Sequence, residues 1–184
     1  MSTKRIAYLL SPVFLLGTIL WMPTLKAADK PSGPQQAWDL LADAKSQAHQ
    51  LKADAQEMES FARDTLAWDS YAYQIMEIKT DVNRVAETVS KLNKVRPIAS
   101  PWQREAIDQV NPILKELAKN VEATIAHLNR DKDRPLQTPA HKEYLKTNAE
   151  LATEMASVIS DFVDYGDAKA KFENLTMQLE VTEK

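Results

Sequence analysis

The amino-acid sequence predicts an all-α protein built as an antiparallel, up-down-up-down four-helix bundle. Glycine occurs only three times in 184 residues, so the turn chemistry of β-hairpins is nearly absent, whereas helix-forming residues are frequent. Apolar residues recur every three or four positions, as is typical of amphipathic and coiled-coil helices. The pairs Ser100-Pro101 and Thr138-Pro139 have the composition of helix starts.

The first helix is expected at about residues 35–66. Its apolar seam alternates three and four residues, and half of its positions are alanine. The seam residues are Leu41, Ala44, Ala48, Leu51, Ala55, Met58, Ala62 and Thr65. Such a seam either packs closely through its small side chains or leaves a groove for a ligand or partner peptide.

The second helix is expected at about residues 70–95. Asp69 or Ser70 is expected to cap its first turn. The helix should stop before Pro97, because the residue preceding a proline is pushed out of helical geometry. Its seam is Tyr71, Ile75, Ile78, Val82, Val85, Val89 and Leu92.

The third helix is expected at about residues 101–129, where Ser100 and Gln103 have the spacing of a capping box. Pro112 lies inside this helix. Because an interior proline removes a backbone hydrogen bond and clashes with the preceding turn, we expect a kink near it. The seam is Ile107, Val110, Leu114, Leu117, Val121, Ile125 and Leu128.

The fourth helix is expected at about residues 139–179, with a weak point or local end at Gly166. Its seam is expected to be Tyr144, Asn148, Leu151, Met155, Val158, Phe162 and Tyr165, continued by Phe172, Leu175 and Leu179. Leu114 and Leu151 should then lie at adjacent levels in the densest part of the core. Asn148 is the one polar residue on this seam, and we expect it to fix the register through hydrogen bonds.

The N-terminus has the organisation of an export signal. Lys4 and Arg5 precede an uncharged apolar run at residues 6–22, and the best cleavage point follows Ala27. Residues 1–27 are therefore interpreted as a signal peptide, residues 28–34 as a flexible leader and residues 35–184 as the bundle domain. An uncleaved membrane anchor is the alternative, because the run reaches the lower limit for a spanning helix. Either interpretation predicts a periplasmic or secreted bundle.

The residues that enzymes and metal proteins use do not form a recognisable set. The chain has no cysteine, and Ser46, Thr124 and Thr138 stand three residues before the histidines, where a di-iron bundle needs glutamate. His49, His127 and His141 are expected to be solvated. We therefore expect no enzymatic activity, no cofactor and no metal. Acidic residues outnumber basic ones, 26 to 23, which makes nucleic acid a poor partner.

The sequence favours a non-enzymatic protein that binds an envelope protein or a peptide. Its candidate surface, for a partner or a hydrophobic ligand, consists of Trp38, Trp68, Tyr73, Trp102, Tyr144 and Asn148. Tryptophans that only close the ends of the bundle are the competing interpretation for these aromatic residues. The alternative function is a small-ligand, metal or haem-binding bundle with a pocket near Met58, Tyr144 and Asn148.

Overall fold

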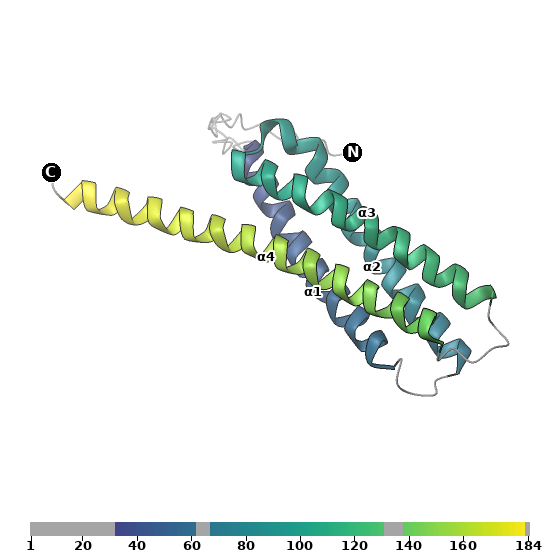
Figure 1. Cartoon of the computed structure of the whole chain (residues 1–184). Helices are drawn as coiled ribbons and strands as arrows, with labels where there is room; N and C mark the ends of the chain where they lie inside the picture. The colour runs from purple at the N-terminus through teal and green to yellow at the C-terminus, as the bar shows by residue number, and fades with distance from the viewer. Residues whose placement is uncertain (1–31, 62–66, 131–137, 183–184) are drawn as a thin grey trace, which may run out of the picture. The chain divides into compact units, whose positions relative to one another are not determined.

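The computed structural model describes residues 32–61, 67–130 and 138–182, and this part of the chain is helical with no strand. The all-α prediction is confirmed. The described residues form four α-helices, with one turn of 3-10 helix (η1) between the second and third. Figure 1 shows how α1 to α4 are arranged. Their bounds are α1 Gly33–Phe61, α2 Trp68–Val95, η1 Arg96–Ile98, α3 Pro101–Arg130 and α4 Pro139–Thr182.

The helix starts differ from the expected caps in two places. α1 begins at Gly33, inside the expected leader, while its predicted end at residue 66 lies outside the described residues. α2 begins at Trp68 after Ala67, which makes no side-chain capping bond, so the expected cap at Asp69 or Ser70 is wrong. The local sequence offers two polar caps, but the helix starts two residues earlier than predicted.

The two proline starts are as predicted. At α3, the Ser100 backbone N–H donates to Gln103 Oε1 at 2.9 Å, which is half of a capping box. Ser100 Oγ has no hydrogen-bond partner among the described residues. At α4, the His141 backbone N–H donates to Thr138 Oγ1 at 3.2 Å. At both helix starts, a side-chain oxygen therefore accepts a hydrogen bond from a backbone N–H.

Each long helix packs against two others: α1 against α2 and α4, and α3 against α2 and α4. Side-chain pairs define the direction of α1 and α4, because Lys45 contacts Asp164 at 2.6 Å and Gln56 contacts Thr153 at 3.3 Å. One residue number rises as the other falls, so these helices run antiparallel. α2 and α3 are also antiparallel, as the pairs Asn93–Asn111 and Trp68–Leu128 show. α3 and α4 are antiparallel as well, as the pairs Asn120–Asn148 and Trp102–Tyr165 show.

The predicted seams of α1, α2 and α3 form the core. Every seam residue of these helices that the structure describes is buried, except Ile125, which is half-buried. Ala62 and Thr65 lie outside the described residues. Leu114 and Leu151 both belong to the core, but they keep 8% and 9% exposure, whereas Leu117 and Met155 have none.

The predicted seam of α4 is correct only in part. Asn148, Leu151 and Met155 are buried as expected, but Tyr165 is 54% exposed, and Tyr144, Val158 and Phe162 are only half-buried. α4 also buries a neighbouring stripe that the sequence did not predict, made of Leu145, Ala149, Ala152, Ala156, Ile159, Val163 and Gly166. This stripe is richer in small residues, and it lets α4 approach the alanine seam of α1 closely.

α3 continues without interruption through Pro112, which is exposed. Asn111 Nδ2 donates to the Ile107 carbonyl at 2.7 Å next to it, and Arg96 binds Asp108 through two hydrogen bonds of 2.7 and 2.6 Å. The surrounding turn is thus held by side chains on the solvent side. The kink expected at Pro112 stays a prediction.

α4 is much longer than its neighbours, with 44 residues against 28 to 30 in the other three helices. Figure 1 shows its C-terminal part running on past the other helices. Gly166 is not a helix end, and every residue from 167 to 180 is exposed. No helix within the described ranges is long and apolar enough to cross a membrane.

Candidate functional site

The six residues of the predicted surface do not form one patch. Trp38 and Trp102 share one end of the bundle, as their positions in the sequence predicted. The other four lie elsewhere: Trp68 and Tyr144 at the opposite end, Tyr73 in the groove between α1 and α2, and Asn148 in the core. We therefore treat each location separately.

The aromatic end consists of Trp38, Trp102, Tyr165 and Gly166, contributed by α1, α3 and α4. The Trp38 and Trp102 rings meet edge to face with centroids 5.8 Å apart, and Trp102 meets Tyr165 in the same way at 5.9 Å. Gly166 is buried beneath the two tryptophans. A Cβ at this position would overlap the Trp38 ring and lie 2.7 Å from the Trp102 ring, so the close packing requires glycine.

A groove of about 450 Å³ opens beside these rings and continues along α4. Trp38, Trp102, Gly166 and Ala170 form its apolar part, and Lys169 and Glu173 form its polar edge, joined by a 2.6 Å ion pair. A hydrogen bond joins two of the helices that line this groove: Gln103 Nε2 donates to the Pro34 carbonyl at 2.8 Å and so connects α3 to the start of α1. Half-buried aromatic rings beside a groove are typical of recognition surfaces.

The exposed C-terminal part of α4 also carries a row of apolar side chains, on a different face of the helix from the groove. We call Tyr165, Ala168, Phe172, Leu175 and Leu179 the C-terminal stripe. Phe172 is 71% exposed and Leu175 is 50% exposed, which is unusual for large apolar residues that share one helix face. The sequence pattern identified these residues, but the expectation that they continue the bundle seam is wrong.

Asn148 is a core residue and belongs to no surface, since its side chain is 1% exposed. Its Oδ1 accepts from Asn120 Nδ2 at 2.7 Å, and its Nδ2 donates to Thr124 Oγ1 at 3.1 Å. Asn120 also donates to the Tyr144 carbonyl at 3.0 Å. This network links α3 to α4 and satisfies the buried amide, as the predicted register role requires.

The opposite end is closed by Trp68 and by two histidines. Trp68 Nε1 donates to the Leu128 carbonyl at 3.1 Å, near the C-terminus of α3. His127 and His141 stack with centroids 5.8 Å apart and are 7% and 1% exposed, so the expectation that they are solvated is wrong. Tyr71 covers His141 edge to face at 5.3 Å, a neighbour that sequence spacing did not reveal. His49 is exposed, as predicted.

His141 is a buried imidazole. Burial lowers its pKa, and the neighbouring His127 lowers it further. Neither ring nitrogen of His141 has a hydrogen-bond partner among the described residues. Two imidazoles are too few for a typical protein metal site, and the described part of the chain holds no group of three histidine, cysteine, aspartate or glutamate side chains arranged for a metal.

Tyr73 lies in an acidic groove of about 340 Å³ between α1 and α2, with Asp54, Glu57 and Glu77. Asp81 is 6% exposed beside it. Burial, a hydrogen bond with Asp54 and the charge of Asp54 together raise the pKa of Asp81 from 3.8 to about 6, against the opposing effect of Arg84, which lies 2.7 Å away. Asp81 therefore resists ionisation at this position.

Asp81 should make the protein less stable as the pH rises from about 4 to above 6. The folded pKa lies above the ordinary value of 3.8, so the folded state binds this proton more tightly, and that advantage is lost once the folded group ionises. We expect Asp81→Asn to raise the free energy of unfolding by about 2 kcal/mol at pH 7.5 and to leave it unchanged near pH 3.

Urea denaturation of both proteins over this pH range measures the difference. Asp161→Asn is the matched control, since Asp161 is exposed on α4. A stability difference that stays constant between pH 3 and pH 7.5 would contradict the assignment to Asp81.

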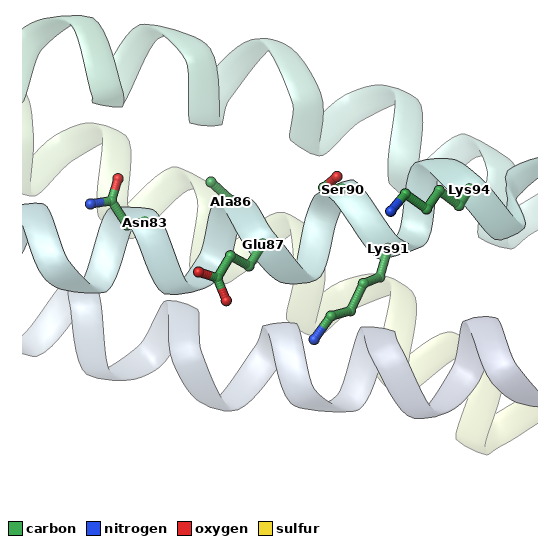
Figure 2. Close-up of a pocket in the computed structure, with 6 residues that line it drawn as sticks. All are labelled: Asn83, Ala86, Glu87, Ser90, Lys91 and Lys94. Carbon is green, nitrogen blue, oxygen red and sulfur yellow. The ribbon is translucent and has the colours of Figure 1, made fainter.

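Another depression, of about 580 Å³, lies on α2 (Figure 2). Figure 2 shows that all six lining side chains come from this one helix: Asn83, Ala86, Glu87, Ser90, Lys91 and Lys94. Ligand sites usually combine polar groups that converge from several elements. This depression therefore offers only a solvated helix surface.

Sequence reasoning missed Tyr165 and Gly166 as members of the aromatic end. The available signal was the three-residue step from Val163 to Gly166, which places a glycine where the buried face of α4 meets Trp38 and Trp102.

Comparison with known proteins identifies no family for this chain: no protein-family model, curated protein or solved structure matches it.

Proposed function

We propose that this chain is an exported, non-enzymatic helical bundle that acts by binding a protein partner. The binding surface is the C-terminal stripe. The observation that carries the proposal is the exposure of Phe172 and Leu175 on a helix that continues past its own bundle. Exposed apolar residues in one row on a helix are typical of helix-mediated protein contacts.

Export rests on the N-terminal pattern of basic Lys4 and Arg5 followed by the apolar run at 6–22. The mature protein is expected to begin near Ala28. N-terminal sequencing of the protein recovered from its native envelope measures this directly. Recovery of Met1 or Ser2 would replace the cleaved form with an anchored one.

The small-ligand alternative placed a pocket near Met58, Tyr144 and Asn148. Met58 and Asn148 are each 1% exposed, and the Asn148 amide is already hydrogen-bonded at both ends, so a ligand there would have to displace core contacts. An absorption spectrum and metal analysis of protein purified from its native compartment would detect a cofactor of that kind. Partner binding at the stripe does not depend on that result.

Partner binding is tested by placing a photoreactive phenylalanine analogue at Phe172 in the full chain. Irradiation of cells producing this variant should give a discrete crosslinked adduct that contains a protein. The matched control carries the same analogue at Lys91, an exposed position on α2. The proposal fails if position 172 gives no more adduct than position 91.

A further inference from the structure

His141 is buried at the end of the bundle where α4 begins. It is 1% exposed, and neither of its ring nitrogens has a hydrogen-bond partner among the described residues. In the unfolded chain water would bond to both nitrogens, so burial without partners costs free energy. An apolar side chain of similar size would fill the same site without that cost, and the presence of a histidine therefore needs another explanation.

Aromatic rings from two other helices cover His141. Tyr71 of α2 meets it edge to face with ring centroids 5.3 Å apart, and His127 of α3 stacks on it at 5.8 Å with an angle of 20° between the rings. We call Tyr71, His127 and His141 the histidine cluster. Tyr71 Oη also donates to the Phe61 carbonyl of α1 at 2.7 Å, so all four α-helices are connected around this imidazole.

The neighbours of His141 on the other helices offer no partner for a proton. From α2 the neighbour is Tyr71, an uncharged phenol, and from α3 it is His127. Arg130 Nη2 lies 3.0 Å from His127 Nδ1, and because arginine can only donate, this contact places a guanidinium charge beside the cluster. No carboxylate of the described residues, on α1 or elsewhere, contributes to the pKa of His141. A proton on His141 would therefore add a positive charge where the described residues supply no negative one.

The helix that carries His141 also disfavours a charge at this position. α4 begins two residues earlier, so His141 lies in its first turn, where the helix dipole is positive. Lys142 and Glu143 are exposed, where water screens their charges, and Tyr144 is an uncharged phenol against His127. In agreement with this geometry, burial and the charge of His127 lower the pKa of His141 from its ordinary value of 6.5.

We propose that the histidine cluster is an acid-sensitive latch, in which a proton on His141 releases the start of α4 from α2 and α3. The charged ring gains the hydrogen bonds that water supplies only when it leaves the cluster, so protonation and opening favour each other. This latch is a property of the bundle itself and does not depend on partner binding at the C-terminal stripe.

The direction of the pH effect follows from the two states of His141. In the open state the imidazole titrates near its ordinary value of 6.5, whereas the closed state lowers its pKa. Above about pH 7 the ring is neutral in both states, and the latch keeps its full stability. As the pH falls below 6.5, the open state takes up protons that the closed state excludes, and the equilibrium shifts toward opening by up to about tenfold per pH unit. Asp81 titrates with the opposite effect, so the test compares variants at the same pH.

Hydrogen exchange of the full chain at pH 7.5 and pH 5.0 tests the latch. After correction for the intrinsic pH dependence of exchange, the protection of the amides at residues 143–148 should fall about tenfold at pH 5.0. Protection at residues 152–159, further along α4, should change much less. Protection at residues 143–148 that is the same at both pH values overturns the proposal.

Two substitutions at His141 assign the effect to this side chain. His141→Leu removes the titrating group, and His141→Gln does so while keeping a polar side chain, so both variants should have the same protection at pH 7.5 and pH 5.0. His49→Leu is the matched control, because His49 is exposed on α1, and it should respond to acid as the natural chain does. An acid response that persists in both His141 variants contradicts the latch.

The natural chain also allows a test without substitution. In nuclear magnetic resonance spectra, the ring-proton signals of His141 should reach half-protonation below pH 6.5, because the closed cluster excludes the proton. A His141 ring that is half-protonated at pH 6.5 or above, while residues 143–148 stay protected, would show that the cluster accepts the charge and would overturn the proposal.

Discussion

Replacing Leu117 with alanine is expected to lower the free energy of unfolding by about 3–5 kcal/mol. Leu117 is fully buried in the middle of α3, within a large core cluster to which all four α-helices contribute. The loss combines the transfer free energy of the deleted atoms with the cost of a cavity that close-packed neighbours cannot fill. Urea denaturation followed by circular dichroism measures it.

Two further leucines calibrate this prediction. Leu114→Ala should cost less, about 2 kcal/mol, because Leu114 retains some exposure and its site can relax toward solvent. Leu175→Ala on the C-terminal stripe should change the stability of the monomer by less than about 0.5 kcal/mol. A larger loss for Leu114 than for Leu117 would mean that the centre of the core is misplaced.

The sequence could predict which faces of α1, α2 and α3 are buried, because each of these helices has one apolar stripe. In α2, for example, Ile75 and Val82 have polar neighbours on the other faces, so only one rotation buries apolar area. α4 offers two stripes one residue apart. The choice between Leu151 and Ala152 as the more deeply buried position depends on how closely α1 approaches, and that information lies in the other helix.

The functional surface was predictable only in part, because the burial of its residues also depends on how other helices pack. The tryptophan pair was found because Trp38 and Trp102 fall near the ends of helices whose order was known. Burial of His141 was missed, because its cover comes from Tyr71, seventy residues earlier. Exposure of Phe172 was missed because seam spacing describes a helix face and gives no information on whether the bundle extends far enough to cover it.

The alanine seam of α1 is the second place where a large stability effect is expected. Ala48 has no exposed surface. The contacts of Lys45 with Asp164 and of His49 with Ser160 place it between the levels of Ile159 and Val163 on α4. Ala48→Leu should therefore lower the free energy of unfolding by about 3 kcal/mol, because the added atoms must separate two close-packed helices.

Ala42→Leu is the matched control for this prediction. It makes the same substitution on the exposed face of α1, where the change should stay within about 0.5 kcal/mol. An Ala48→Leu variant as stable as the natural chain would mean that α1 stands away from α4 and leaves a groove between them. The occupant of that groove would then compete with the C-terminal stripe as the explanation of partner binding. A destabilised variant, by contrast, leaves the stripe as the surface through which the closed bundle binds.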